Sequence, residues 1–186
     1  MDDRRSTDAH GHDVIDPLYA AVVTVSSSRA DAEDPEDPGG DEVAAAFRED
    51  GHVIRDRRVV RDDFATIRTT VGTLCERRDV DVVVATGGTG VTVDDVTPEA
   101  VEAILERELP GFGELFRMLS WEEVGSRAMA SRATAGIAAD TPVFAIPGST
   151  GACQTACGEL IVPEAPHLAG LATAHRIEEL ELSAFR

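Results

Sequence analysis

Two adjacent carboxylates beside a glycine-rich turn are the residues of this sequence best suited to chemistry. Asp94 and Asp95 follow closely on Thr86-Gly87-Gly88-Thr89-Gly90. Glycines let backbone N–H groups face a bound anion and let the chain approach it, and carboxylate oxygens are hard ligands of Mg²⁺. The pattern predicts a site for a magnesium-bound phosphate, although many glycine turns between a strand and a helix bind nothing.

The turn differs from two familiar nucleotide-binding signatures. It has neither the Gly-x-Gly-x-x-Gly spacing of dinucleotide-binding folds nor the Gly-Lys-Ser/Thr end of a P-loop. The chain contains no lysine, so no lysine can reach a phosphate, but the arginine side chains of Arg132 and Arg29 could hold phosphate oxygens.

The elements around the turn would place it at one end of a sheet. Val80–Ala85 is apolar and β-branched, which is typical of a strand buried on both faces. Thr97-Pro98-Glu99 would open a helix running from Thr97 to Glu108, with Thr97 as its N-cap.

A second strand, glycine loop and helix follow later in the chain. Pro142–Ile146 reads as a buried strand, Pro147-Gly148-Ser149-Thr150-Gly151 as a loop, and Thr150–Leu160 as a helix. Ligands of parallel sheets bind beyond the carboxyl ends of the strands, so we expect the two glycine loops to converge.

The alternation of strands and helices predicts an α/β fold with a mainly parallel sheet and helices on both faces. Asp62 or Asp63 would cap one of these helices. The other expected elements are strands Leu18–Ser26 and His52–Val60, helices Asp41–Asp50, 64–77 and Ser126–Ala139, a loop Ala30–Gly40 and a helix break at Pro110–Glu114.

Length and composition indicate a single domain with tails. A chain of 186 residues with 42% hydrophobic residues can bury one sizeable core. We expect a disordered acidic tail over residues 1–16, a domain over 17–165 and a helical tail over 166–186. Apolar runs are too short to span a bilayer.

The charge is strongly acidic. Thirty-five acidic residues against 17 basic ones give a net charge of −18, which would repel nucleic acids and anionic membranes. We interpret this charge as the salt-adapted surface of a cytoplasmic protein from a halophile.

Three cysteines without a signal peptide indicate reduced thiols in a cytosol. Cys153 and Cys157 are four residues apart and would share one helix face. Two thiols are half a zinc site at best, so we expect Cys75, Cys153 and Cys157 to serve as small buried apolar residues.

Several motifs occur in the order found in the MogA/MoaB proteins of molybdenum cofactor biosynthesis. The chain resembles this family, and its MoaB branch in particular, over about Leu18 to Pro163. The motifs are Thr86–Gly90, Asp95, Thr97-Pro98-Glu99-Ala100, Pro110-Gly111-Phe112-Gly113-Glu114, Phe116-Arg117, Ser131-Arg132-Ala133 and Pro147-Gly148-Ser149.

The resemblance implies a three-layer α/β fold that forms homotrimers, or hexamers in the MoaB branch. It implies adenylylation of molybdopterin with ATP and Mg²⁺: the pterin phosphate attacks the α-phosphorus of ATP and releases pyrophosphate. The product would pass to a metal-insertion protein, with molybdenum or tungsten as the final metal.

The family's motif acids fall on Asp62 and Asp95, which would be catalytic and hold the Mg²⁺. Its nucleotide and phosphate contacts fall on Thr86, Gly87, Gly88, Thr89 and Gly90. The remaining contacts fall on Pro147, Gly148, Ser149 and Thr150, and those to the pterin fall on Ser131 and Arg132.

Three departures from the family pattern leave a second function open. Thr150 stands where many relatives carry a second proline, Gly39 replaces a serine of an Asp-x-Ser-Gly loop, and Asp94 adds a negative charge beside Asp95. The alternative is a non-catalytic molybdopterin carrier or scaffold.

Overall fold

The computed structural model describes residues 4–7, 11, 13–33 and 36–174. The strands are β1 (Arg5–Thr7), β2 (Asp13–Ile15), β3 (Tyr19–Val25), β4 (Val53–Val60), β5 (Val82–Thr86), β6 (Arg107–Glu108), β7 (Thr134–Ala138) and β8 (Thr141–Ile146). The α-helices are α1 (Ser27–Ala30), α2 (Pro38–Glu49), α3 (Phe64–Cys75), α4 (Thr97–Glu102), α5 (Pro110–Val124), α6 (Thr150–Ala156) and α7 (Val162–Ala172). A 3₁₀-helix (Gly125–Ala130) follows α5, and a π-helical turn (Cys157–Ile161) joins α6 to α7.

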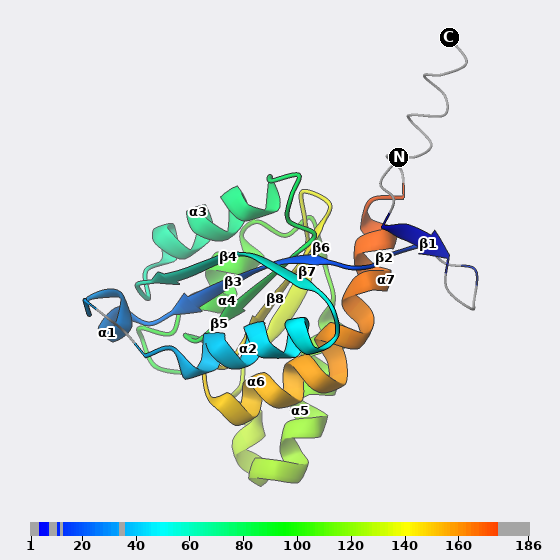
Figure 1. The fold of residues 1–186 in the computed structure, drawn as a ribbon. Coiled ribbons are helices and arrows are strands. Elements are labelled where there is room, and N and C mark those ends of the chain that lie inside the picture. Colours follow the sequence, from blue (N-terminus) through cyan, green and yellow to red (C-terminus); the bar gives the residue numbers. More distant parts are fainter. Residues whose placement is uncertain (1–3, 8–10, 12, 34–35, 175–186) are drawn as a thin grey trace.

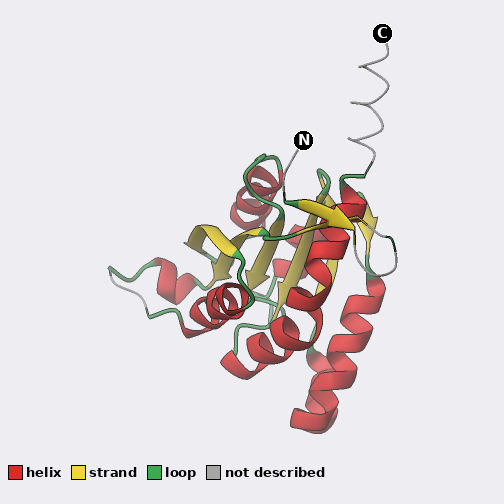
Figure 2. Cartoon of the chain, turned by 45° about the vertical axis from the view of Figure 1, so that its right-hand side comes forward, coloured by secondary structure: helices red, strands yellow, loops and turns green. Residues whose placement is uncertain are grey.

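The main sheet has the strand order β4-β3-β5-β8-β7-β6 and lies between two layers of helices (Figures 1 and 2). β4, β3, β5 and β8 are parallel, whereas β7 runs antiparallel to β8 and β6 antiparallel to β7. This arrangement confirms the predicted α/β class with a mainly parallel sheet.

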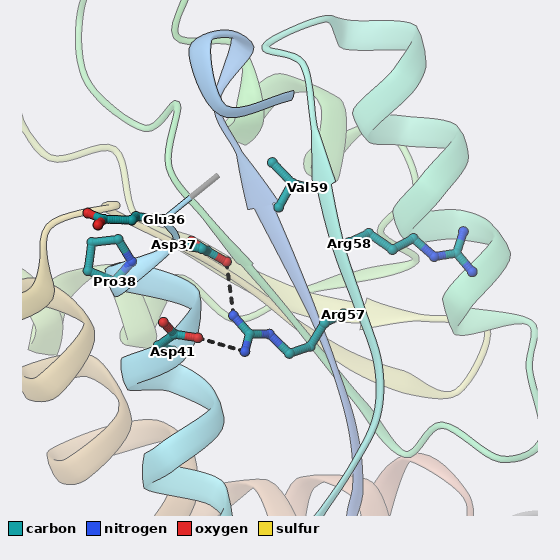
Figure 3. Close-up of a pocket in the computed structure, with 7 residues that line it drawn as sticks. All are labelled: Glu36, Asp37, Pro38, Asp41, Arg57, Arg58 and Val59. Carbon is teal, nitrogen blue, oxygen red and sulfur yellow. Dashed lines mark hydrogen bonds and ion pairs between the residues drawn. The ribbon is translucent and has the colours of Figure 1, made fainter. Parts of the chain in front are cut away.

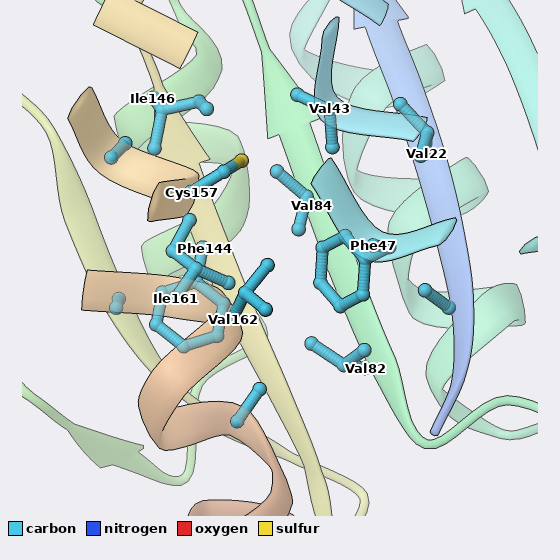
Figure 4. Packing of buried hydrophobic residues seen from close by; sticks show 14 of the residues in the cluster. Val22, Val43, Phe47, Val82, Val84, Phe144, Ile146, Cys157, Ile161 and Val162 are labelled. Atoms are coloured by element: carbon cyan, nitrogen blue, oxygen red, sulfur yellow. The ribbon is translucent and has the colours of Figure 1, made fainter. Parts of the chain in front are cut away.

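Alternate residues of the central strands face the two helix layers, as the two-residue period of a strand requires. Val22 and Val84 point into the core beneath α2, α5, α6 and α7, where Phe47 of α2 packs against them (Figure 4). Val23 and Ala85 point to the other face, against α3 and α4. Both faces of β3 and β5 are therefore buried, which explains their continuous apolar sequences.

The two strands that follow β3 in the chain, β4 and β5, lie on opposite sides of it in the sheet. The connection from β3 through α2 reaches β4 on one side, and the connection through α3 then returns to β5 on the other side. α2 and α3 consequently cover opposite faces. Such a switch point leaves a crevice at the carboxyl ends of the two strands, where ligands of open α/β sheets bind.

The predicted helix Ser126–Ala139 is wrong. Its second half is β7, which forms a hairpin with β8 through Ala139 and Asp140, both at positive φ (46° and 63°). The run of small residues suits a strand because a Cβ on Gly136 would lie 2.4 Å from the Arg107 carbonyl of the neighbouring strand. Alanine-rich composition favoured a helix, and close strand packing decided otherwise.

Prolines begin two helices that the sequence interpretation placed elsewhere. The expected break at Pro110–Glu114 is the first turn of α5, and α2 begins at Pro38 within the expected loop Ala30–Gly40. Proline suits a first helical turn because its missing N–H would have no partner there. The expected helix Thr97–Glu108 ends as α4 at Glu102, and β6 occupies part of the remainder.

The segments outside the main domain also differ from expectation. Within residues 1–16, predicted to be disordered, β1 and β2 pair with each other, and a Cβ on Gly170 of α7 would lie 2.0 Å from the Asp13 carbonyl. The proposed boundary at 165/166 falls inside α7, and residues 175–186 lie outside the described residues. No described helix is both long and apolar enough to cross a membrane.

Candidate functional site

The glycine turn lies at the switch point between β3 and β5. A Cβ on Gly87 would lie 2.3 Å from the Val25 carbonyl oxygen at the end of β3, and Gly87 has a φ of +106°. Only glycine fits such a conformation and such a close approach. The Gly87 N–H donates to the Ile146 carbonyl at the end of β8 (2.9 Å), so the turn links the carboxyl ends of three neighbouring strands.

The second glycine loop packs directly against the first, as predicted. The Thr86 hydroxyl donates to the Pro147 carbonyl (3.1 Å), and a Cβ on Gly148 would lie 3.2 Å from the Gly87 Cα. Ser149 caps α6 by accepting from the Ala152 N–H (3.4 Å). Residues Thr86–Gly90 and Pro147–Thr150 thus lie side by side at the carboxyl ends of the strands.

Asp62 approaches the first glycine loop from the end of β4. Its N–H donates to the Ser27 hydroxyl (3.1 Å), which fixes the backbone, and its Oδ1 is buried against Gly88 with no hydrogen-bond partner among the described residues. Burial first, and then the negative charges of Asp95 and Asp94, raise the pKa of Asp62. A carboxylate oxygen that is buried and unpaired marks a position where a proton or a cation would be favourable.

Asp95 lies near Asp62 but has its own partners. Its Oδ2 accepts from the Thr92 N–H (2.8 Å) and the Thr92 hydroxyl (2.6 Å). Burial tends to raise the pKa of Asp95, but these bonds, a bond from the Gly90 N–H and the charge of Arg132 outweigh it, so that the pKa is lowered. The pKa of Asp95 is therefore shifted in the opposite direction from that of Asp62.

The neighbouring acid Asp63 has a structural role. It caps α3, accepting from the Thr66 N–H (2.8 Å) and the Thr66 hydroxyl (2.7 Å). This outcome resolves the alternative left open by the sequence: Asp63 caps the helix, and the adjacent Asp62 faces the glycine turn.

Arg132 ties the acidic loop to the rest of the site. Its Nε donates to the Gly90 carbonyl (2.6 Å), its Nη2 donates to the Asp95 carbonyl, and its Nη1 pairs with Glu99. Its backbone N–H donates to the Thr89 carbonyl (3.0 Å). The sequence predicted phosphate or pterin contact for this side chain. The structure adds that Arg132 positions the loop bearing Asp95, a role for which the sequence held no signal.

Ser131 lines a depression next to this loop. Together with Arg117, Met129 and Arg132 it borders a cavity of about 440 Å³ beneath the start of α5. Arg117 donates to the Ser131 carbonyl (3.4 Å), so the predicted pterin-contact segment is anchored to α5.

Sequence reasoning did not predict a cavity of about 600 Å³ between α2 and β4 (Figure 3). Asp37 caps α2 through the Gly40 N–H (3.1 Å) and accepts from the Thr24 hydroxyl (2.8 Å). Arg57 bridges Asp37 (3.1 Å) and Asp41 (2.7 Å) across the cavity, whereas Arg58 points away from it and pairs with Asp56. Arg29, a predicted phosphate ligand, instead donates to the Glu36 carbonyl (2.8 Å).

The three cysteines are free and buried, as predicted. Burial raises the pKa of the Cys75 and Cys157 thiols to about 12. Cys153 is also buried, with a raised pKa, and lies 3.3 Å from the Thr86 hydroxyl. Thiols in this state are poor nucleophiles and poor metal ligands.

A divalent cation fits the donor chemistry of the site. The carboxylates of Asp62 and Asp95 are hard oxygen ligands, and one of their oxygens is orphaned. Among the described residues no group of three or more His, Cys, Asp or Glu side chains could hold a metal. Mg²⁺ is commonly bound through one or two carboxylates together with substrate phosphates, which matches two acids beside a phosphate cradle.

Comparisons with known proteins point to one family. Residues 21–167 match the family described as "Probable molybdopterin binding domain". The chain is 43% identical to molybdenum cofactor biosynthesis protein B of Escherichia coli K12, covering 80% of this chain and 85% of the relative. It is 40% identical to the Bacillus subtilis protein of the same name, covering 88% and 95%.

Solved structures agree. A crystal structure of molybdenum cofactor biosynthesis protein B superposes with a TM-score of 0.79 at 42% identity, covering 86% of this chain and 96% of the other. The tungsten cofactor synthesizing protein MoaB from Pyrococcus furiosus gives a TM-score of 0.72 at 33% identity, covering 84% and 98%. A MogA structure gives 0.72 at 27% identity, covering 81% and 99%.

Proposed function

Because the chain belongs to the MoaB/MogA family of molybdenum cofactor biosynthesis proteins, we propose that it is a molybdopterin adenylyltransferase. A terminal phosphate oxygen of molybdopterin would attack the α-phosphorus of ATP. The new P–O bond forms as the bond to the β-phosphate breaks, and pyrophosphate leaves with that electron pair. The reaction needs no protein nucleophile, which is consistent with three buried cysteines of high or raised pKa.

Two polyanions must be brought together for this reaction, so the site has to offset their repulsion. Backbone N–H groups in the turn Thr86–Gly90 and the loop Pro147–Thr150 would face the ATP phosphates, apart from those of Gly87 and Gly90, which already bond within the protein. Asp62 and Asp95 would hold Mg²⁺, which when bound neutralises phosphate charge. Arg132 holds the loop bearing Asp95 against the turn through its bonds to the Gly90 and Asp95 carbonyls. The segment at Ser131 would contact the pterin.

The observation that carries this proposal is the orphaned Oδ1 of Asp62. A buried carboxylate oxygen without a partner costs free energy in the folded protein, and in this structure it lies beside the glycine turn and near a second acid. A cation bound with ATP would remove that cost, so a catalytic site explains the arrangement better than a structural one does.

The test is a pyrophosphate assay with molybdopterin, ATP and Mg²⁺ at high salt. We expect the wild-type chain to release pyrophosphate in proportion to adenylylated pterin, and Asp62→Asn to reduce turnover by at least about 100-fold, the loss seen when one key electrostatic group is removed. Asp63→Asn is the matched control: it changes the adjacent residue, keeps a good helix cap and should retain turnover.

A carrier function is the rival proposal. Asp94 favours it, because its charge makes ionisation of Asp62 still harder. Molybdopterin binding by the wild-type chain with no pyrophosphate at any Mg²⁺ concentration would reject the enzyme and support the carrier. We also propose homotrimers or hexamers, hand-off of the product to a metal-insertion protein, and a cytoplasmic location.

A further inference from the structure

Thr97 carries a buried hydroxyl with no assigned function. The residue is fully buried, and its Oγ1 has no hydrogen-bond partner among the described residues. The sequence predicted that this hydroxyl caps α4, but the cap position is Val96 and the Thr97 side chain makes no capping bond. An unpaired buried hydroxyl costs about 1–3 kcal/mol, so some other partner would be favourable at this position.

The Thr97 hydroxyl converges with Asp62 over Gly88. A Cβ placed on Gly88 would lie 2.5 Å from Thr97 Oγ1 and 2.2 Å from Asp62 Oδ1. Both of these oxygens are buried and unpaired. They come from different parts of the chain, the start of α4 and the end of β4, and the missing side chain at Gly88 lets them approach the same point.

The charges around this point favour a cation over an anion. Asp62 is flanked by the negative charges of Asp95 and Asp94. Two carboxylates alone leave a small cation with few protein donors, and no third acid or histidine completes a cluster in the described part of the chain. A neutral hydroxyl oxygen can supply the missing donor, as the Ser/Thr of a P-loop does for Mg²⁺.

We propose that the Thr97 hydroxyl oxygen is a third protein donor of the divalent-cation site formed with Asp62 and Asp95. The proposal rests on the proposed function only in taking Mg²⁺ as the natural cation. It concerns cation binding by the chain itself, before either substrate is present.

Mn²⁺ binding measured by electron paramagnetic resonance, without ATP or pterin, tests the proposal. The acidic surface will also attract Mn²⁺. The measurement therefore follows only the Mn²⁺ ion that binds to wild type and no longer binds to Asp62→Asn at the same high salt concentration. Thr97→Val should weaken that ion at least about tenfold, within the range seen when groups supporting a metal site are removed. Thr97→Ser, which keeps the hydroxyl oxygen, should bind Mn²⁺ with an affinity within about threefold of that of wild type.

Thr141→Val is the matched control. Thr141 is also a buried threonine, at the start of β8 and away from the carboxyl ends, and its hydroxyl donates to the Cys75 carbonyl (3.1 Å). Its replacement should leave the Mn²⁺ affinity unchanged. An unchanged affinity in Thr97→Val, or a wild-type chain with no Mn²⁺ ion that depends on Asp62, overturns the proposal.

A measurement on the wild-type chain covers the case in which Thr97→Val does not fold. Mn²⁺ at the concentration that fills the Asp62-dependent site should broaden the γ-methyl NMR signal of Thr97, and Asp62→Asn should remove this broadening; a Thr97 signal that stays sharp when that ion is bound rejects the proposal. The two proposals fail separately. Cation binding that depends on Thr97, without pyrophosphate release, rejects only the adenylyl transfer. Pyrophosphate release with an unaltered cation affinity in Thr97→Val rejects only the role of Thr97.

Discussion

Asp62 and Asp95 lie at the same end of the sheet, but the fold shifts the pKa values of their carboxyl groups in opposite directions. Burial and neighbouring acids raise the pKa of Asp62, whereas hydrogen bonds to Thr92 lower that of Asp95. A carboxyl group with a raised native pKa stabilises the fold at low pH, and this contribution is lost as the pH rises through the raised value. Asp95 behaves in the opposite way, since its contribution is present at neutral pH and is lost on acidification.

The paired substitutions should therefore shift stability in opposite directions. At pH 7 without divalent cations we expect Asp62→Asn to raise the melting temperature. Asp95→Asn should lower the free energy of unfolding by about 1 kcal/mol, the net value of a lost hydrogen bond, while largely keeping pterin binding. Asp95→Asn should abolish turnover, and Asp62→Asn should reduce it by at least about 100-fold.

Thermal unfolding across pH checks this prediction. The difference between wild type and Asp62→Asn should vanish at the low pH where Asp62 is protonated, because both side chains are then neutral. A variant Asp62→Asn that is less stable than wild type at pH 7 would show that this carboxylate stabilises the fold.

The elements around the site are strands that end at glycine turns, and the glycines are there for steric reasons. Gly87 combines a φ of +106° with close approach to the Val25 carbonyl. An added Cβ would have to separate β3 from β5, the two strands that border the crevice. A substitution that changes the geometry of the turn would therefore also destabilise the central sheet.

We expect Gly87→Ala to lower the free energy of unfolding by at least about 2 kcal/mol, since strain and a backbone clash act together. Gly72→Ala on α3 is the matched control, because a Cβ there meets nothing within 4 Å. It should raise stability by about 0.5–1 kcal/mol through helix propensity. Denaturant titration at constant salt measures both, and equal stability of Gly87→Ala and wild type would contradict the steric account.

On the scale of the whole molecule, an acidic chain carries an exposed apolar strip. Leu115, Met118 and Trp121 of α5 and Met129 of the following 3₁₀-helix are each at least half exposed, and Met129 is 84% exposed. With a net charge of −18, copies would repel one another at low salt and associate through apolar surface once the charge is screened. The salt-adapted surface remains a prediction.

We propose that this strip lies in the interface of the proposed homo-oligomer. In multimolar KCl, light scattering coupled to size exclusion should give a trimer or hexamer for the wild type and a smaller species for Trp121→Glu. Leu171→Glu, on α7 and 50% exposed, is the control and should leave the assembly intact. A wild-type monomer at high salt would contradict the proposal.

Local patterns determined much of this protein in advance. The buried strands around Val22, Val84 and Val143, the two glycine loops and a helix start at Asp62 or Asp63 follow from short-range rules, because β-branched runs, glycine and capping residues have strong local preferences. The adjacency of the two loops also followed, since parallel strands carry their carboxyl ends to one edge. The motifs alone sufficed to indicate the family.

Only the tertiary structure decided the rest. Residues Thr134–Ala138 are a strand because β6 and β8 lie close enough to require small side chains there, and no local rule records that distance. The same holds for Thr97, which could have capped a helix by sequence yet points its hydroxyl at Gly88 and Asp62. Arg132 likewise acquires its partners from a loop about forty residues away, because a long side chain takes its role from whatever the fold brings within its reach.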